Sequence, residues 1–210
     1  MSVKRKNSLL VIGLLLIIIG IMIGIVPIFL NKEEIKIDNQ KVDDYINKSS
    51  IKRKNVIITN VITTEPTTTV KNNQEDFLLV LEIPKVDLKK GVYTFNSPLN
   101  NLEKNVEILK ESNLPGVEKG NVVLQAHNGT SKKSFFGKLH LMEVNDYVYI
   151  YYNGIKYTYK IDKIYDVSKD GDVEIYRDLD KTTLTLITCK KGTKDKQIVI
   201  VSYLENEEEY

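Results

Sequence analysis

The sequence predicts a mostly β domain of about eight short strands and one or two short helices, in a closed or nearly closed barrel that follows an N-terminal transmembrane helix. Three observations support this fold class. Short runs of β-forming residues recur from Phe77 onward, separated by turn residues. Asn153-Gly154 joins two of these runs, and Asn-Gly suits a type I′ hairpin turn. Residues 9–30 are almost wholly apolar and carry no charge.

The apolar stretch 9–30 is long enough to span a hydrocarbon core of about 30 Å as a helix. Lys4, Arg5 and Lys6 precede it, so the positive-inside rule places residues 1–8 in the cytoplasm and the rest of the chain outside the cell. A cleavable signal peptide is the alternative. Its apolar region would be only roughly 7–15 residues long. No small-x-small cleavage site follows Pro27, which favours a retained single-pass anchor.

Residues 31–76 are polar and weakly patterned, which favours an extracellular stalk. The threonine- and proline-rich tract 63–69 is typical of an extended, solvated chain, and a short helix fits Lys41–Lys48. Residues 77–204 form the predicted folded domain, and residues 205–210 form an acidic tail.

The first expected strand of the domain is Phe77–Ile83, a continuous apolar run. A helix is expected over Leu99–Ser112, because Leu102, Val106 and Leu109 recur at spacings of four and three. The other expected strands are Asn121–His127, Asp146–Tyr152, Ile155–Ile161 with a continuation over Ile164–Val167, Thr183–Thr188 and Ile198–Leu204.

Charge and cysteine content exclude several function classes. A net charge of +2 over 210 residues lacks the strong basic excess of a dedicated nucleic-acid binder. One cysteine cannot form an intramolecular disulfide, and with two histidines it falls short of a Cys/His zinc site. We therefore expect no cofactor. A thiol nucleophile and a buried, inert thiol are the two interpretations of Cys189.

Cys189 and His127 each close a run of β-forming residues, where a rigid sheet can aim both side chains at one point. A reactive cysteine needs a base or an ion-pair partner, because the thiolate is the nucleophile. The other histidine, His140, lies between apolar residues with no turn beside it, so we expect a structural or surface role. His127 leads into a polar loop, the better place for a general acid or base.

These residues resemble a known family. The Thr-Leu-Ile-Thr-Cys run that ends at Cys189 resembles the signature of sortases, the surface transpeptidases of Gram-positive bacteria. Gly120–His127, followed by Phe-Phe-Gly-Lys-Leu at 135–139, resembles the histidine region of that family, and Leu81–Lys85 resembles its first-strand motif. The similarity covers roughly Phe77–Leu204 in order and spacing.

The resemblance implies an eight-stranded sortase-like β-barrel in the cell membrane and a cysteine transpeptidase, with hydrolase or acyltransferase chemistry at the cell wall. By this resemblance, Cys189 attacks a Leu-Pro-x-Thr-Gly-type sorting signal of a surface protein between Thr and Gly, and His127 is the general acid/base. An amine from a cell-wall precursor or a pilin lysine then resolves the thioester.

One residue of the family pattern is missing. Sortases carry an arginine near the start of the last strand, which helps to hold the substrate and the oxyanion, and residues 195–201 contain none. Alignment backward from Val201 places Gln197 at that position, and a slip of one residue places Lys196 there. Both donate hydrogen bonds, but neither has the planar fork of guanidinium. Backbone N–H groups after Cys189 are a further expected source of oxyanion donors.

The spacing also bears on the subclass and on the alternatives. From His127 to Cys189 is 62 residues (189 − 127), too short for the helical insertion of class B sortases. No second apolar span follows the barrel, so a compact class A, D or E enzyme is expected rather than class C.

Two alternatives to a transpeptidase are open. One is a hydrolytic cysteine protease of another fold, and the other is a non-catalytic surface module, which the missing arginine supports.

Calcium is the one metal for which the sequence offers candidate ligands. The acidic loop Lys169–Asp180 could hold it together with Glu103, Glu107 or Glu111. Solvated carboxylates are the favoured interpretation, because no fixed ligand-loop motif is present.

Overall fold

The computed structural model describes residues 3–62 and 77–210 of the chain. The chain divides into two units, Met1–Gln40 and Lys41–Tyr210, and each is described by itself. The tract 63–69 lies outside the described residues, so its extended conformation stays a prediction.

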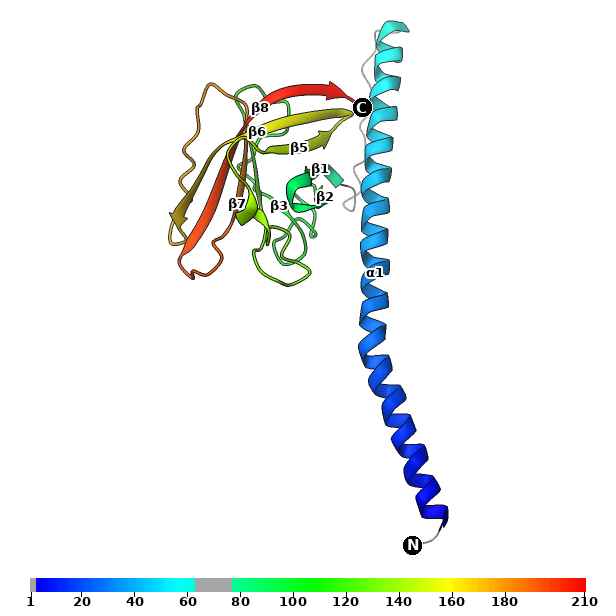
Figure 1. The fold of residues 1–210 in the computed structure, drawn as a ribbon. Helices are drawn as coiled ribbons and strands as arrows, with labels where there is room; N and C mark the ends of the chain where they lie inside the picture. The colour runs from blue at the N-terminus through cyan, green and yellow to red at the C-terminus, as the bar shows by residue number, and fades with distance from the viewer. Residues whose placement is uncertain (1–2, 63–76) are drawn as a thin grey trace. The chain divides into compact units, whose positions relative to one another are not determined.

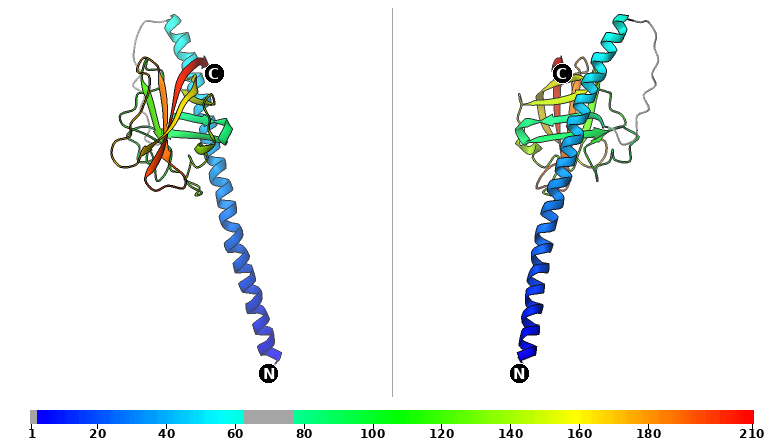
Figure 2. Two further views of the ribbon diagram at one scale, coloured as in Figure 1. Left: turned by 60° about the vertical axis from the view of Figure 1, so that its left-hand side comes forward. Right: turned by 90° about the vertical axis from the view of Figure 1, so that its right-hand side faces the viewer.

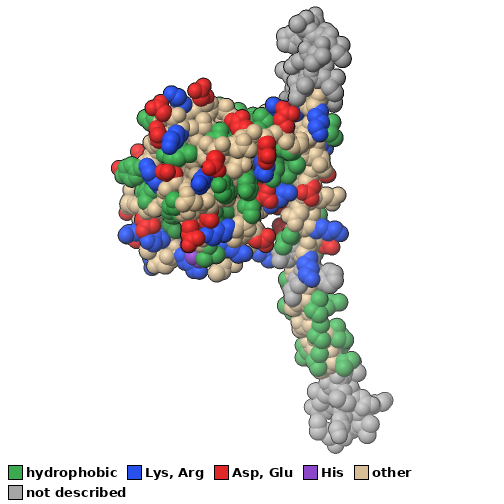
Figure 3. Space-filling view, turned by 45° about the horizontal axis from the view of Figure 1, so that its top comes forward, with side chains coloured by type: hydrophobic (Ala, Val, Ile, Leu, Met, Phe, Trp, Pro, Cys, Tyr) green, Lys and Arg blue, Asp and Glu red, His purple; other side chains and the backbone are tan. Residues whose placement is uncertain are grey.

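The first unit is the N-terminal part of helix α1, which runs over Val3–Ile62. Most of its large apolar side chains between Ile12 and Leu30 are exposed, and Figure 3 shows hydrophobic side chains covering this part of the helix. Within the described residues, Ile12–Lys54 is the one helical stretch long and apolar enough to cross a membrane, by length and composition. It contains most of the predicted anchor 9–30. The charged side chains at positions 4–6 lie outside the described ones, so the orientation stays a prediction.

The second unit contains a nearly closed barrel, made by one eight-stranded sheet in the order β2-β1-β5-β6-β8-β7-β4-β3 (Figure 1). The strands are β1 (Phe77–Ile83), β2 (Leu88–Tyr93), β3 (Glu107–Ile108), β4 (Asn121–Gln125), β5 (Tyr147–Tyr152), β6 (Ile155–Ser168), β7 (Thr183–Cys189) and β8 (Lys196–Glu209). Two short 3₁₀ helices, η1 (Pro84–Val86) and η2 (Leu139–Leu141), lie in the connections.

Neighbouring strands are antiparallel except for β4 and β7, which are parallel. The chain leaves β4, forms the β5–β6 hairpin and returns to place β7 beside β4 (Figure 2). The two edge strands approach each other through Asn105, which lies just before β3. Its buried amide nitrogen Nδ2 donates to the carbonyl oxygen of Gly91 in β2 at 2.8 Å.

Both faces of the β4–β7–β8 part of the sheet are covered. The inner face belongs to the main core, which includes Leu124, Leu184 and Ile200. The outer face carries a second cluster, formed by Val123, Ile187, Val199 and Val201 and covered by Val173 and Ile175 of the β6–β7 loop. Burial on both faces explains why β7 has a nearly continuous run of buried residues rather than an alternating one.

Most of the expected strands are confirmed, including Phe77–Ile83 and the β5–β6 hairpin with its extension. The hairpin turn has φ values of 50° at Asn153 and 76° at Gly154, as a type I′ turn requires. The fold class predicted from sequence is therefore confirmed.

The helix expected over Leu99–Ser112 is wrong; turns and the short strand β3 take its place. The reason lies in the local asparagines, whose side chains compete with helical backbone bonds. Asn100 donates from Nδ2 to the carbonyl oxygen of Ile108 at 3.0 Å and accepts from the N–H of Ile108 at 2.9 Å. The side-chain oxygen of Asn101 accepts from the N–H of Glu103 at 2.8 Å.

The two segments that flank the predicted domain have more regular structure than expected. The short helix expected over Lys41–Lys48 is confirmed as part of the much longer α1, which continues to Ile62. Its part Lys41–Lys54, here called the docked segment, belongs to the same unit as the barrel. Residues 205–210 are not a free tail, because β8 continues to Glu209 and pairs with β6 down to Ile155.

Candidate active site

Cys189 and His127 lie at the same end of two adjacent parallel strands. Cys189 is the last residue of β7 and is half-buried. In the parallel register Gln125 of β4 faces Ile187 of β7, and the N–H of Ala126 continues the pairing by donating to the carbonyl oxygen of Ile187 at 3.3 Å. His127 comes next, at the level of Cys189. The parallel pairing thus brings together two residues far apart in the sequence.

The two side chains also belong to the same face of the sheet. Successive side chains of a strand alternate between faces. Cys189 lies two residues beyond Ile187, and His127 lies four residues beyond Val123. Both Ile187 and Val123 belong to the outer cluster. Cys189 and His127 are therefore placed on the outer face, where the β6–β7 loop packs.

Gln197 completes this arrangement on the other side of β7. In the antiparallel β7–β8 register Gln197 is directly opposite Cys189, so the two side chains share a face. The side-chain oxygen Oε1 of Gln197 is buried and has no hydrogen-bond partner among the described residues. Lys196 pairs with Ser168 of β6 and is exposed. The register therefore favours Gln197 over Lys196 as the residue beside Cys189.

No arginine side chain is near the thiol in the described part of the chain. Arg53 bonds Glu209 at 3.0 Å, and Arg177 bonds the hydroxyl of Thr183 at 3.3 Å, at the opposite end of β7 from Cys189. The departure from the family pattern seen in the sequence is thus a real feature of the site.

The first backbone N–H after Cys189 is already used. The N–H of Lys190 donates to the carbonyl oxygen of Lys196 at 2.8 Å. This group was among the expected oxyanion donors, and in this structure it holds the β7–β8 connection instead. Of the donors expected beside Cys189, Gln197 is therefore the remaining side-chain candidate.

A buried aromatic residue fixes the loop that carries His127. Phe136 is fully buried, and its N–H donates to the carbonyl oxygen of His127 at 3.1 Å. On the side-chain side, Nε2 of His127 lies 3.1 Å from Oε1 of Glu103. The Glu103 side chain is 79% exposed, so water screens this pair and it orients the ring only weakly.

Sequence reasoning missed one residue of this site, Asn128. Its side-chain Nδ2 donates to the carbonyl oxygen of Cys189 at 2.7 Å, and its Oδ1 is buried without a partner among the described residues. The only sequence signal was its position directly after His127.

His140 is not part of the site. It is exposed in η2, and its Nδ1 lies 3.1 Å from the carbonyl oxygen of Gly137, within its own turn. This agrees with the surface or structural role expected from its position.

Two of the carboxylates considered as possible calcium ligands have other contacts. Glu103 faces His127, and Oε2 of Glu107 accepts from the side chain of Gln125 at 3.0 Å. Within residues 12–54 and 77–210, whose side chains the structure describes for the most part, no group of three or more His, Cys, Asp or Glu residues is arranged to hold a metal ion. The expectation of solvated carboxylates rather than a calcium site stays a prediction.

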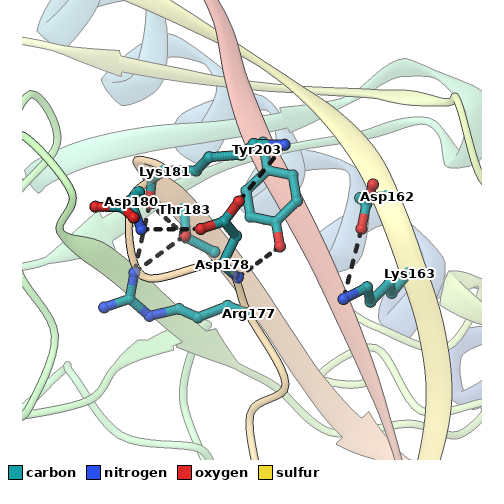
Figure 4. Close-up of polar contacts among 8 residues, drawn as sticks. All are labelled: Asp162, Lys163, Arg177, Asp178, Asp180, Lys181, Thr183 and Tyr203. Atoms are coloured by element: carbon teal, nitrogen blue, oxygen red, sulfur yellow. Dashed lines mark hydrogen bonds and ion pairs between the residues drawn. The ribbon is translucent and has the colours of Figure 1, made fainter.

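The β6–β7 loop, residues 169–182, is fixed over the outer face by polar contacts (Figure 4). The N–H of Asp178 donates to the hydroxyl of Tyr203 in β8 at 2.8 Å. The hydroxyl of Tyr165 in β6 accepts from the N–H of Tyr176 at 2.7 Å and donates to the carbonyl oxygen of Glu174 at 3.1 Å. Burial raises the pKa of Tyr165, which extends to higher pH the range over which its hydroxyl stays a neutral donor.

A known protein family matches the part of the chain that contains the candidate site. The sortase domain family matches residues 81–205, which include His127, Cys189 and Gln197. This chain belongs to the sortase family. No curated protein sequence matches it.

Solved structures of sortases share the fold. A sortase D5 transpeptidase from Clostridium perfringens is 21% identical, with a TM-score of 0.59 over 81% of this chain and 99% of that one. Sortase A from Listeria monocytogenes is 23% identical, with a TM-score of 0.54 over 64% and 90%. A Clostridium perfringens sortase C with the C-terminal cell wall sorting motif is 24% identical, with a TM-score of 0.56 over 80% and 89%. The likeness spans several classes and supports the fold alone.

Proposed function

We propose that this protein is a membrane-anchored cysteine transpeptidase that cleaves a Leu-Pro-x-Thr-Gly-type sorting signal and transfers the protein to an amine on the cell surface. One observation carries the proposal. The registers of β4, β7 and β8 bring His127, Cys189 and Gln197 to one end and one face of the sheet. Membership of the sortase family supports the same reaction class.

The first half of the reaction is acylation. The thiolate of Cys189 attacks the carbonyl carbon of the signal threonine, and the negative charge moves to the carbonyl oxygen. The amide of Gln197 can turn its nitrogen toward this oxygen, because the two ends of an amide have nearly the same shape. As the C–N bond breaks, protonated His127 gives its proton to the leaving glycine amine, which leaves a thioester on Cys189.

The second half is transfer. An amine of the acceptor attacks the thioester carbon, neutral His127 takes the proton from its nitrogen, and Cys189 leaves as the thiolate. The product is a new amide bond. We propose surface proteins with a C-terminal sorting signal as donors and a cell-wall precursor or pilin amine as acceptor. A compact class A, D or E enzyme fits the short span between His127 and Cys189.

The proposed location is the cell membrane, with the N-terminus in the cytoplasm and the barrel outside. Because Cys189 is the only cysteine, a Cys189→Ala background gives a clean labelling test. A thiol reagent that cannot cross membranes should label Asn39→Cys in intact cells and should miss Ser2→Cys. The reverse pattern would contradict the orientation.

The activity test is a reaction with a library of sorting peptides and a set of amines, read by mass spectrometry. The proposal predicts a new amide product that disappears in His127→Ala and persists in His140→Ala. A hydrolysed peptide with no amine product would indicate a protease instead. No turnover of any peptide would favour a non-catalytic module, the alternative that the missing arginine supports.

A further inference from the structure

The peptide unit between Cys189 and Lys190 is held from both sides. A trans peptide is planar and its C=O and N–H point in opposite directions. On one side, the carbonyl oxygen of Cys189 accepts from Nδ2 of Asn128 at 2.7 Å. On the other side, the N–H of Lys190 donates to the carbonyl oxygen of Lys196 at 2.8 Å. One rigid plane therefore links the loop after β4 to the start of β8.

The residues that hold this plane are the sequence neighbours of the other two candidate catalytic residues. Asn128 follows His127, and Lys196 precedes Gln197. A second side-chain bond joins the ends of β4 and β7, and here the donor is on β7. The buried hydroxyl of Thr188 donates to the carbonyl oxygen of Ala126 at 2.8 Å. These side-chain bonds and the β4–β7 and β7–β8 pairing together set where the thiol lies relative to its two neighbours.

Asn128 is a poor choice if stability alone were required. Its Oδ1 is buried and has no partner among the described residues, and an unpaired buried acceptor costs free energy. Local violations of this kind concentrate at functional sites. The amide nitrogen of Asn128 does have a partner, and that partner is the carbonyl oxygen of Cys189.

We infer that Asn128 is a positioning residue, which fixes the aim of the Cys189 thiol through the Cys189–Lys190 peptide; the inference rests on the proposed function. Without the Asn128 donor the carbonyl of Cys189 is free to tilt. The tilt moves the Cys189 side chain relative to His127 on one strand and Gln197 on the other. A small displacement of a nucleophile lowers the rate of the chemical step far more than it weakens substrate binding.

The test compares Asn128→Ala and Asn128→Asp in the full-length protein in detergent micelles. Aspartate keeps the shape of asparagine and loses the N–H donor. We expect kcat for a sorting peptide to fall roughly 10- to 100-fold in both variants, with KM little changed. Thr130→Ala, at an exposed position of the same loop, is the matched control and should keep the wild-type kcat. Unfolding curves correct each kcat for the folded fraction.

A second readout needs no substrate. Amide hydrogen exchange of the peptide that contains Lys190 should be faster in both Asn128 variants, because its N–H belongs to the plane that Asn128 holds. Unchanged exchange, or a wild-type kcat in Asn128→Asp, would overturn the inference. A wild-type protein that turns over no peptide would overturn the proposed function instead, while hydrogen exchange would still decide whether Asn128 holds the plane.

Discussion

The docked segment of α1 and the strand ends around Cys189 differ in whether their buried polar side chains have hydrogen-bond partners. In the docked segment, the hydroxyl of Tyr45 donates to the carbonyl oxygen of Leu78 at 2.5 Å, and the hydroxyl of Ser49 lies 2.6 Å from that of Tyr210. Among the described residues, five buried side-chain atoms have no hydrogen-bond partner. Two of them, in Asn128 and Gln197, flank Cys189, and none lies in the docked segment.

The docked segment also buries apolar surface. Val42 is 1% exposed and packs with Phe77 and Val80 of β1, beside the partly buried ring of Tyr45. Arg53 adds an ion pair with Glu209 at 3.0 Å. The difference between the regions separates two tasks: the docked segment packs against the fold, while the strand ends keep unsatisfied groups beside the candidate nucleophile.

Substitution of Cys189 should separate the effect on activity from the effect on stability most clearly. Cys189→Ala should abolish transpeptidation, because no other side chain can form the thioester. The same change removes little volume from a half-buried position, so the unfolding free energy should stay within about 1 kcal/mol of wild type. Urea unfolding and product mass spectrometry measure the two effects. Residual transfer by the alanine variant would remove the basis for assigning the chemistry to the strand ends.

The next largest loss of activity is expected from substitution of Gln197, which lies opposite Cys189 and has a buried amide oxygen without a partner among the described residues. Gln197→Ala is expected to lower kcat about 10²- to 10³-fold, the usual cost of a lost oxyanion donor. The neighbouring Lys196→Ala is the matched control, because Lys196 pairs with Ser168 and not with Cys189. Gln197→Arg should keep or raise activity, since a charged donor binds an oxyanion more strongly. If Lys196→Ala alone is crippling, the roles of these two residues are the reverse of those assigned here.

In the docked segment the effect should fall on stability alone. Val42→Ala should lower the unfolding free energy by about 2 kcal/mol, from lost burial and a residual cavity. Ile51→Ala in the same segment is the control, since Ile51 is 59% exposed and should change stability by less than about 0.5 kcal/mol. Neither change should alter kcat/KM by more than about twofold. A large loss of kcat in Val42→Ala would show that the docked segment also shapes the site.

The smallest effect is expected at an unsatisfied group far from the thiol, the hydroxyl of Tyr159 in the main core. Burial raises the pKa of Tyr159, so the folded state favours its neutral form. That preference stabilises the fold below pH of about 10 and is lost as pH rises above it. Tyr159→Phe should therefore flatten the fall of unfolding free energy above pH 10.

At neutral pH, Tyr159→Phe should be neutral or slightly stabilising, because it removes an unpaired buried group. Activity should not change. A clear loss of stability at pH 7 would mean that the hydroxyl has a partner, and would weaken the comparison between the two regions.

Much of the barrel could be predicted from the sequence, because its strands have strong apolar runs and its hairpin has an Asn-Gly turn. Cys189 and His127 could be placed at strand ends for the same reason. Their proximity could not be derived from pattern alone, since the β4–β7 pairing is parallel and joins segments distant in sequence. The family resemblance supplied that step.

Other features could not be predicted because they depend on particular side-chain contacts, some local and some tertiary. The 99–112 segment has helical spacing, but its asparagine side chains bond the backbone and prevent the helix. The docked segment did carry a signal, with Val42, Tyr45 and Ile46 at the spacing of one helical face. Its partner surface on β1 could not be seen in the sequence. For the contact of Asn128 with Cys189, the only sequence signal was the position of Asn128 directly after His127.

The measurement that tests the central claim most directly is the intact mass of the protein after brief exposure to a sorting peptide without an amine acceptor. We predict a mass increase equal to the peptide fragment ending at threonine, less one water. Digestion should place it on Cys189, and hydroxylamine should remove it, as it does a thioester. Transfer product formed without any adduct on Cys189, or an adduct on another side chain, would contradict the account.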